Sequence, residues 1–278
     1  MMGNQGIDDD YIVFADANVE AICAANWGKK GKLTYKQAAK VTSLGTVFRA
    51  NTTIASFDEL QYFTGLTSIG SADTSANGAF NGCTALASVV IPSSVTRIRG
   101  YSFYGCTALT TVGSLGNITY VGAAAFQNCT HLTTVVSLAN LVTVGGSAFW
   151  GCSAWNDELN CPNLTGSIPS NAFRGTKLTK VLNLGSITSI SSYVFATCNS
   201  MTEIHLPATL TSTATASVGT SNSSTTAMLT VYSYNTTPPI YGRECFRAAK
   251  VSAVYVPSES VSDYQTKWSA LSSKIQAM

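Results

Sequence analysis

The sequence predicts a solenoid, in which repeated turns stack and short parallel strands form one wall. The first observation is a phrase of the form Phe-x-x-Cys-x-x-Leu that recurs with a step of 23 residues. The second is that apolar residues recur at the same offsets after each cysteine, as in Leu86, Val89, Val95 and Ile98. Self-similarity at a period of 20–50 residues is typical of repeat architectures. The repeated phenylalanines and cysteines are Phe80, Phe103, Phe126, Phe149, Cys83, Cys106, Cys129 and Cys152.

The composition is compatible with such a stack and argues against other classes of protein. Of 278 residues, 45% are hydrophobic and 11% are charged, against roughly 25% charged residues in ordinary globular domains. The net charge is +2, and no basic stripe or acidic tail indicates a nucleic acid or an anionic membrane surface as partner. The apolar runs are short and interrupted by Gly, Ser and Thr, so we expect no transmembrane helix.

Residues 1–59 are predicted to form a helical N-terminal cap and lead-in. Asp16 is placed to cap a first helix, and Thr34 with Gln37 forms a capping box before a second one. The turn between these helices has the placement of a calcium loop, but lysines stand where carboxylates are needed, so no metal is expected. The first ten residues lack a charged start followed by an apolar core, so no signal peptide is expected in this chain.

The solenoid is predicted over residues 60–257, and its later units depart from the pattern. The Cys152 unit has one extra residue before Phe173, and spacing puts Glu158 where other units have valine. The next unit lacks its cysteine. Residues 211–227 are a Ser/Thr-rich insertion with few apolar side chains, which we interpret as a surface loop.

Residues 258–278 are predicted to form a capping helix that covers the open end of the stack. The helix is expected to begin at Ser258 or Ser260. Its apolar residues are spaced by three and four positions, as on one face of an amphipathic helix. These residues are Val261, Tyr264, Trp268, Leu271 and Ile275.

The cysteines that share one repeat position are expected to form a column of buried, reduced thiols. Equivalent residues of neighbouring turns lie about one strand spacing, ~4.8 Å, apart. A column of disulfides or of metal sites is the alternative, and metal is the weaker one because no histidine joins these positions and no Cys-x-x-Cys occurs.

The outward residues of the strands are the candidates for a binding site on a concave wall. The early units present a threonine ladder that includes Thr111 and Thr134, although threonine is also simply a good exposed strand residue. Charged groups gather in the later units, and an aromatic residue follows at the end. These later candidates are Asp157, Lys180, Glu203, His205 and Tyr255.

Catalysis and cofactor binding are not expected. The two histidines, His131 and His205, fall in different units, and neither a Gly-x-Ser-x-Gly nor a His-Glu-x-x-His motif occurs. Glu203 and His205 share one face of a strand and could form an acid/base pair, but such pairs are more often solvated.

The spacing Phe-x-x-Cys-x-x-Leu-x-x-Val/Ile-x-Ile-Pro, best matched from Phe80 to Pro92, resembles the BspA-like (Treponema-type) leucine-rich repeat. The resemblance extends over residues 60–257, and the flanking segments are similar to those of gut Bacteroidetes proteins. It implies short parallel strands on the concave side, an irregular convex side, and a surface or secreted protein associated with adhesion. No enzymatic role is implied.

The sequence therefore predicts a monomeric, non-catalytic adhesion module at a bacterial surface or outside the cell. It would engage a protein or glycan of a host or neighbouring cell through the concave wall and adjoining loops. The alternative is a structural or host-recognition component of a phage or mobile-element particle, which the missing signal peptide and the methionine start would fit.

Overall fold

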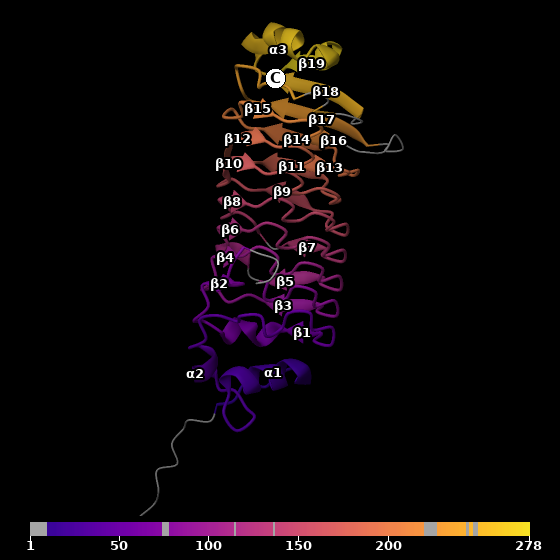
Figure 1. Ribbon diagram of the computed structural model, residues 1–278. Coiled ribbons are helices and arrows are strands. Elements are labelled where there is room, and N and C mark those ends of the chain that lie inside the picture. The colour runs from indigo at the N-terminus through magenta and orange to yellow at the C-terminus, as the bar shows by residue number, and fades with distance from the viewer. Residues whose placement is uncertain are drawn as a thin grey trace, which may run out of the picture.

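The computed structural model describes residues 10–73, 78–113, 115–135, 137–219, 227–242, 245–246 and 250–278. It is an elongated stack of turns, with helices α1 (Ala17–Trp27) and α2 (Tyr35–Ala38) at one end and α3 (Val261–Lys267) at the other (Figure 1). In the described part of the chain, no helix has the length and apolar character needed to cross a membrane. The predicted solenoid with helical ends is confirmed.

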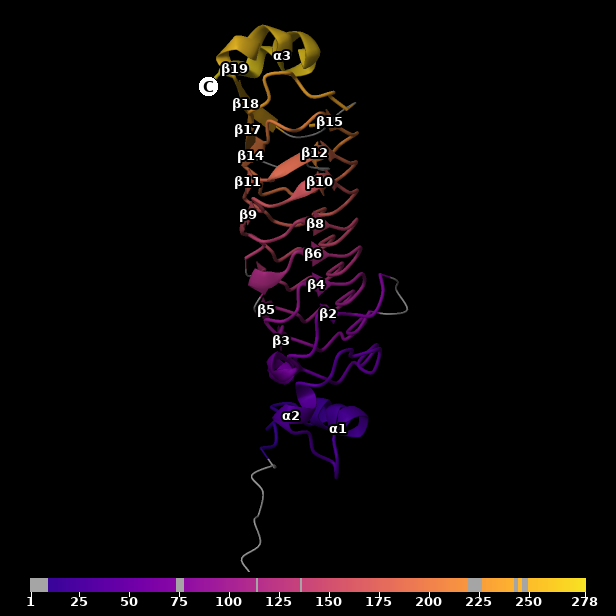
Figure 2. The same ribbon diagram turned by 90° about the vertical axis from the view of Figure 1, so that its left-hand side faces the viewer.

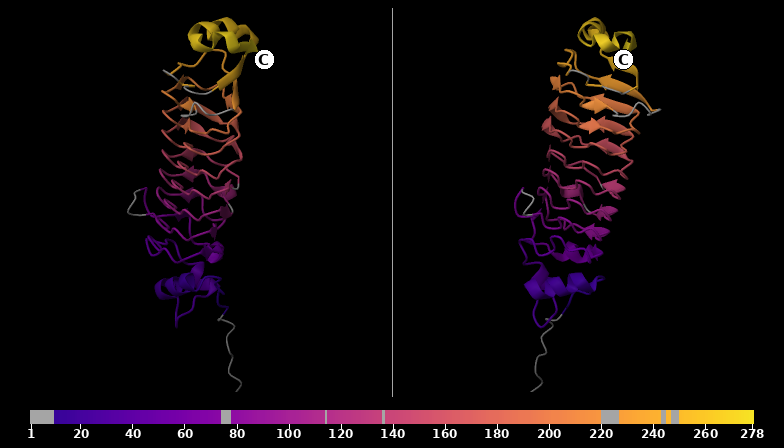
Figure 3. Two further views of the ribbon diagram at one scale, coloured as in Figure 1. Left: turned by 90° about the vertical axis from the view of Figure 1, so that its right-hand side faces the viewer. Right: turned by 45° about the vertical axis from the view of Figure 1, so that its right-hand side comes forward.

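One side of the stack, which we call the ladder face, carries two parallel sheets that follow one another along the length (Figure 3). The first has the order β1-β3-β5-β7 and the second the order β19-β18-β17-β14-β11-β9. This is the wall that the repeat pattern predicted. Its strands are β1 (Ser56–Phe57), β3 (Ser88–Val90), β5 (Thr111–Gly113), β7 (Thr134–Val135), β9 (Glu158–Asn160), β11 (Lys180–Asn183), β14 (Glu203–Leu206), β17 (Met228–Ser233), β18 (Lys250–Val256) and β19 (Ile275–Ala277).

The side expected to be irregular also carries parallel strands, seen toward the viewer in Figure 2. They form the sheets β2-β4-β6-β8 and β10-β12-β15, whereas a separate pair, β13 with β16, lies across the stack from them, at the right in Figure 1. Most have only two residues, so the resemblance alone did not predict them. They are β2 (Ser68–Ile69), β4 (Arg97–Ile98), β6 (Tyr120–Val121), β8 (Thr143–Val144), β10 (Thr165–Ile168), β12 (Ser186–Ile190), β13 (Phe195–Ala196), β15 (Ser212–Thr213) and β16 (Val218–Gly219). The 3₁₀ helices are η1 (Asp58–Tyr62), η3 (Leu115–Asn117), η4 (Ser258–Ser260) and η5 (Ser269–Lys274).

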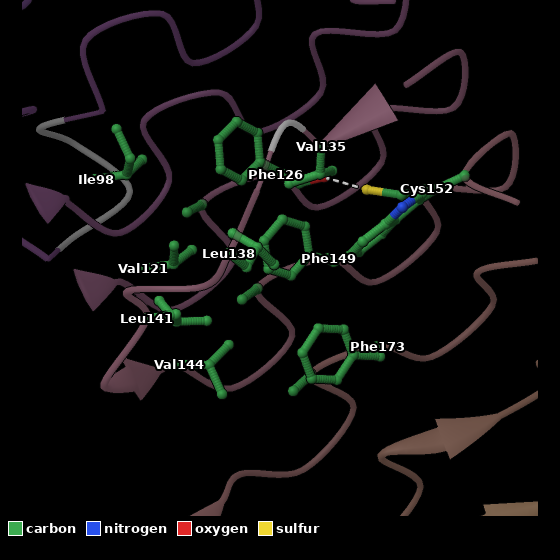
Figure 4. Packing of buried hydrophobic residues seen from close by; sticks show 14 of the residues in the cluster. Ile98, Val121, Phe126, Val135, Leu138, Leu141, Val144, Phe149, Cys152 and Phe173 are labelled. Carbon is green, nitrogen blue, oxygen red and sulfur yellow. Dashed lines mark hydrogen bonds between the residues drawn. The ribbon is translucent and has the colours of Figure 1, made fainter. Parts of the chain in front are cut away.

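The repeated phenylalanines form a buried column along the stack. Phe126 lies 5.1 Å from Phe103 and 5.3 Å from Phe149 between ring centroids, with ring planes within 7° of parallel. The column continues to Phe173 (Figure 4), and all these rings are fully buried. Burial of rings of this size is a main source of stability in a core.

The repeated cysteines connect each turn to the one before it. The thiol of Cys129 donates to the carbonyl of Phe103 at 3.0 Å, and that of Cys152 donates to the carbonyl of Phe126 at 3.1 Å (Figure 4). The eight cysteines are buried free thiols, so the prediction of buried thiols is confirmed. In the turn that lacks its cysteine, Thr176 takes this position, but its hydroxyl donates to the Phe173 carbonyl of the same turn, which also accepts from the Cys198 thiol of the next turn.

Threonine and asparagine side chains make the same kind of contact at the surface. The hydroxyl of Thr133 donates to the carbonyl of Thr110, whose own hydroxyl donates to the carbonyl of Ala87. The amide of Asn163 likewise donates to the carbonyl of Ala139. The polar residues that recur in the repeats therefore join neighbouring turns by hydrogen bonds, which need no charged side chains.

The N-terminal cap forms as the sequence predicts. Asp16 accepts from the N–H groups of Asn18 and Val19 at the start of α1 and also from the N–H of Ala55 beside β1. One carboxylate therefore caps the helix and attaches it to the first turn. The Thr34–Gln37 capping box is present, although α2 is only four residues long.

The interpretation of residues 211–227 as a surface loop is wrong for residues 211–219. Strand β15 pairs with β12, and β16 pairs with β13. Thr213, Ser217 and Val218 are buried, because small residues fit between closely stacked turns. Residues 220–226 lie outside the described residues.

The C-terminal end is also more varied than the single predicted helix. Helix α3 ends at Lys267, and β19 pairs in parallel with β18 through Ile275 and Val254. Tyr264 and Trp268 are buried as predicted. Val261 and Leu271 are half-buried, and Ile275 is buried from a strand instead of a helix. The spacing of three and four therefore identified the side chains that pack against the core but not the conformation of Ile275.

Phe126→Ala should lower the free energy of unfolding by about 3–5 kcal/mol, because it removes a fully buried ring and leaves a cavity. The loss is measured by urea denaturation, with the exposed substitution Thr111→Ala as control. An unchanged urea midpoint for Phe126→Ala would contradict a buried column.

The thiols should resist alkylation near pH 8 in the folded protein and react in urea. Burial raises the pKa of Cys83 to about 12 and that of Cys198 to about 11. The unfolded chain ionises its thiols near 9.0, so stability should also fall as the pH rises from 9 toward 11. Mass spectrometry after labelling counts the reacted thiols. Rapid labelling of the native protein would contradict the column.

Candidate binding face

The extra residue of the Cys152 turn decides which side chains share the ladder face. Glu158 pairs with Lys180, and Leu159 pairs with Val181. Leu159 is therefore the buried residue, and Glu158 is exposed. The spacing put Glu158 where other units have valine, and this prediction is wrong, because Leu159 takes the buried place and Glu158 stands in line with Lys180.

Three charged side chains lie side by side in neighbouring strands. Lys180 Nζ lies 3.8 Å from Glu158 Oε1 and 3.8 Å from Glu203 Oε2. The side chains of Lys180 and Glu158 are 40% and 46% exposed. Ion pairs at this exposure add little to stability, so the arrangement mainly holds charges at a defined place on the face.

Three rings form a second row beside these charges. His205 pairs with Tyr232, and Tyr232 pairs with Tyr255. The ring centroids are 4.5 and 5.2 Å apart, with interplanar angles of 15° and 17°. The rings therefore cover one another's faces.

His205 joins the two rows by hydrogen bonds. Its Nε2 lies 2.7 Å from Glu203 Oε1, and its Nδ1 lies 2.6 Å from the hydroxyl of Tyr234. In a neutral imidazole, Nε2–H donates to the carboxylate and Nδ1 accepts from the tyrosine. Burial, together with Tyr232 and Glu203, raises the pKa of Tyr234, which keeps its hydroxyl protonated and able to donate.

A recess of about 200 Å³ borders this network. It is lined by Leu182, Asn183, Leu184, His205, Pro207 and Tyr234. A second recess, of about 180 Å³, lies where the two sheets of the ladder face meet, and Trp155, Asp157 and Glu158 are among its lining residues. Asp157 is exposed there, and its Oδ1 accepts from the N–H of Glu158.

The structure divides the predicted site. It brings Lys180, Glu203, His205 and Tyr255 together on the six-stranded sheet. Thr111 belongs to the four-stranded sheet, where its backbone pairs with that of Thr134.

Sequence reasoning missed Glu158, Tyr232 and Tyr234 as site residues. Tyr232 lies in the strand after the Ser/Thr-rich insertion and Tyr234 directly follows it, where the cysteine offsets could not be counted. The alternation of buried and outward residues could have identified Tyr232, because Val231-Tyr232 repeats the pattern of Ile204-His205.

The chemistry of the described residues gives no metal centre, since no group of three or more His, Cys, Asp or Glu among them could hold an ion. Burial also raises the pKa of the thiols, including Cys106 and Cys129. Buried protonated thiols are poor nucleophiles.

The family model for the BspA type leucine-rich repeat region, six copies long, matches residues 51–156, 119–228 and 166–267. These matches include most of the chain. The chain belongs to the BspA-type leucine-rich repeat family. No curated protein matches it.

Two solved structures are similar to this BspA-type protein. A leucine-rich repeat protein from Bacteroides ovatus is 18% identical with a TM-score of 0.43; the similarity covers 69% of this chain and 59% of that one. The chain thus spans less than two thirds of that relative. A leucine rich cell surface protein from Faecalibacterium prausnitzii is 16% identical with a TM-score of 0.31, over 69% of this chain and 78% of that one.

Lys180→Met should change the free energy of unfolding by less than about 1 kcal/mol, because both of its ion pairs are solvated. Leu178→Ala, at a fully buried position just before the same strand, should cost about 2–5 kcal/mol. Urea denaturation of both variants makes the comparison. A loss for Lys180→Met as large as that for Leu178→Ala would mean that the charges support the fold.

Proposed function

We propose that this protein is a non-catalytic binding module that engages a protein or glycan through the six-stranded part of the ladder face. The observation that supports this most directly is the row of His205, Tyr232 and Tyr255 beside the charges of Glu203 and Lys180. Tyrosine is among the residues that dominate binding energy at interfaces.

The construction of the face also favours binding. The side chains project from paired strands, and His205 is fixed through both ring nitrogens. Ordered side chains lose little conformational entropy when a partner binds. Parallel strands repeated along a solenoid also provide an extended surface, as repeat proteins use for partners.

The family supports a place at the bacterial surface or outside the cell, with adhesion to a host or neighbouring cell as the role. The module would act as a monomer. The Glu203–His205 contact could in principle transfer a proton, but both ring nitrogens are engaged within the fold, which favours a role in positioning side chains.

An array of glycans and host surface proteins, probed with the full chain, tests this function. Tyr232→Ala should weaken binding of the true partner at least about tenfold, as expected for an interface residue. Tyr193→Ala removes an exposed tyrosine elsewhere and should leave binding unchanged. Equal loss in both variants, or no loss in either, would exclude the ladder face as the binding surface.

A further inference from the structure

The recess beside His205 lies at the end of the aromatic row. Leu182 and His205 follow the paired residues Val181 and Ile204 in neighbouring strands, so they are neighbours across the face. Leu182, Leu184 and Pro207 give the recess apolar walls, and the rings of His205 and Tyr234 give it aromatic ones. An elongated side chain that is apolar along its length and polar at its tip would match this lining.

The aromatic row is poorly suited to stacking on a sugar. A pyranose packs its C–H groups on an open aromatic face, whereas His205 covers one face of Tyr232 and Tyr255 covers the other. The row therefore presents ring edges and hydroxyl groups to a partner. The outer rings of the row are His205 and Tyr255, and the recess adjoins the His205 end.

The charges around the recess favour a cation. Glu203, which contacts His205, and Glu158, two strands away, supply two carboxylates, and the ammonium group of Lys180 lies between them. This part of the face is therefore negative, in a protein whose net charge is +2.

We infer that the recess receives an arginine side chain of a protein partner, which rests on the proposed function of the ladder face and specifies it. The arginine stem packs on Leu182, Leu184 and Pro207, and its guanidinium lies against the rings of His205 and Tyr234. A guanidinium is planar and weakly hydrated, so it stacks on aromatic faces better than a lysine ammonium does. Nearby Glu203 stabilises the charge.

Titration of the full chain with arginine methyl ester, followed by NMR, tests this inference. We expect saturable binding, with lysine methyl ester at least about fivefold weaker because its ammonium keeps its hydration. Leu182→Trp fills the recess from a half-buried position and should weaken binding at least about tenfold. Glu203→Gln keeps the shape, removes the charge and should also weaken binding. Tyr193→Ala is the unchanged control.

Two results would overturn the inference: no saturable binding of arginine methyl ester, or binding that survives both Leu182→Trp and Glu203→Gln. Circular dichroism of each variant shows that the fold is retained, and Glu203→Gln remains informative if Leu182→Trp does not fold. Partners from the array that depend on Tyr232 but bind through no arginine would overturn the inference and leave the proposed function intact. An array without any Tyr232-dependent partner would instead overturn the proposed function.

Discussion

The fold depends on a contact between turns, the hydrogen bond from each repeated cysteine to the carbonyl of the phenylalanine one turn earlier. The Phe103 carbonyl, which lies in the core, also accepts from the N–H of Cys106 in its own turn, so the thiol of Cys129 adds a second bond that joins this turn to the next. The thiol is small enough to lie under the next turn and still donate. The thiols and rings therefore have to keep their places in the column, so a turn of different length takes up the difference between these positions.

This constraint explains the effect of the extra residue in the Cys152 turn. The ring column continues without a step, with Phe149 and Phe173 5.6 Å apart and 6° from parallel. At β9 the buried place falls at Leu159, one residue later than the step of 23 from Val135, and the ladder face changes there from one sheet to the next. Glu158 then faces solvent and aligns with Lys180. The charged row thus arises at the turn where the repeat spacing changes, while the buried column of rings stays aligned.

Positions that keep the repeat spacing could be predicted from the sequence, and positions where the spacing changes could not. Phe126 and Cys129 recur at a fixed step, so their burial follows from periodicity. Asp157 was assigned to the charged row by counting, and one residue of offset in a strand exchanges the inward and outward faces. Thr213 was assigned to a loop because its composition is polar, yet it is buried where turns pack closely. Composition and residue counting therefore mispredict which side chains are buried where the length of a turn varies.

The stacking contacts also limit where a partner can be recognised. Along the early ladder, the hydroxyls of Thr110 and Thr133 donate to carbonyls of the preceding turn, so their protons are used by the fold. Around His205, the hydrogen bonds join side chains to side chains, and Tyr234 and Lys180 remain partly exposed. These groups can change partners without breaking the stack. We therefore expect recognition in the later turns, where side chains are held by one another and the backbone of the repeat is already satisfied.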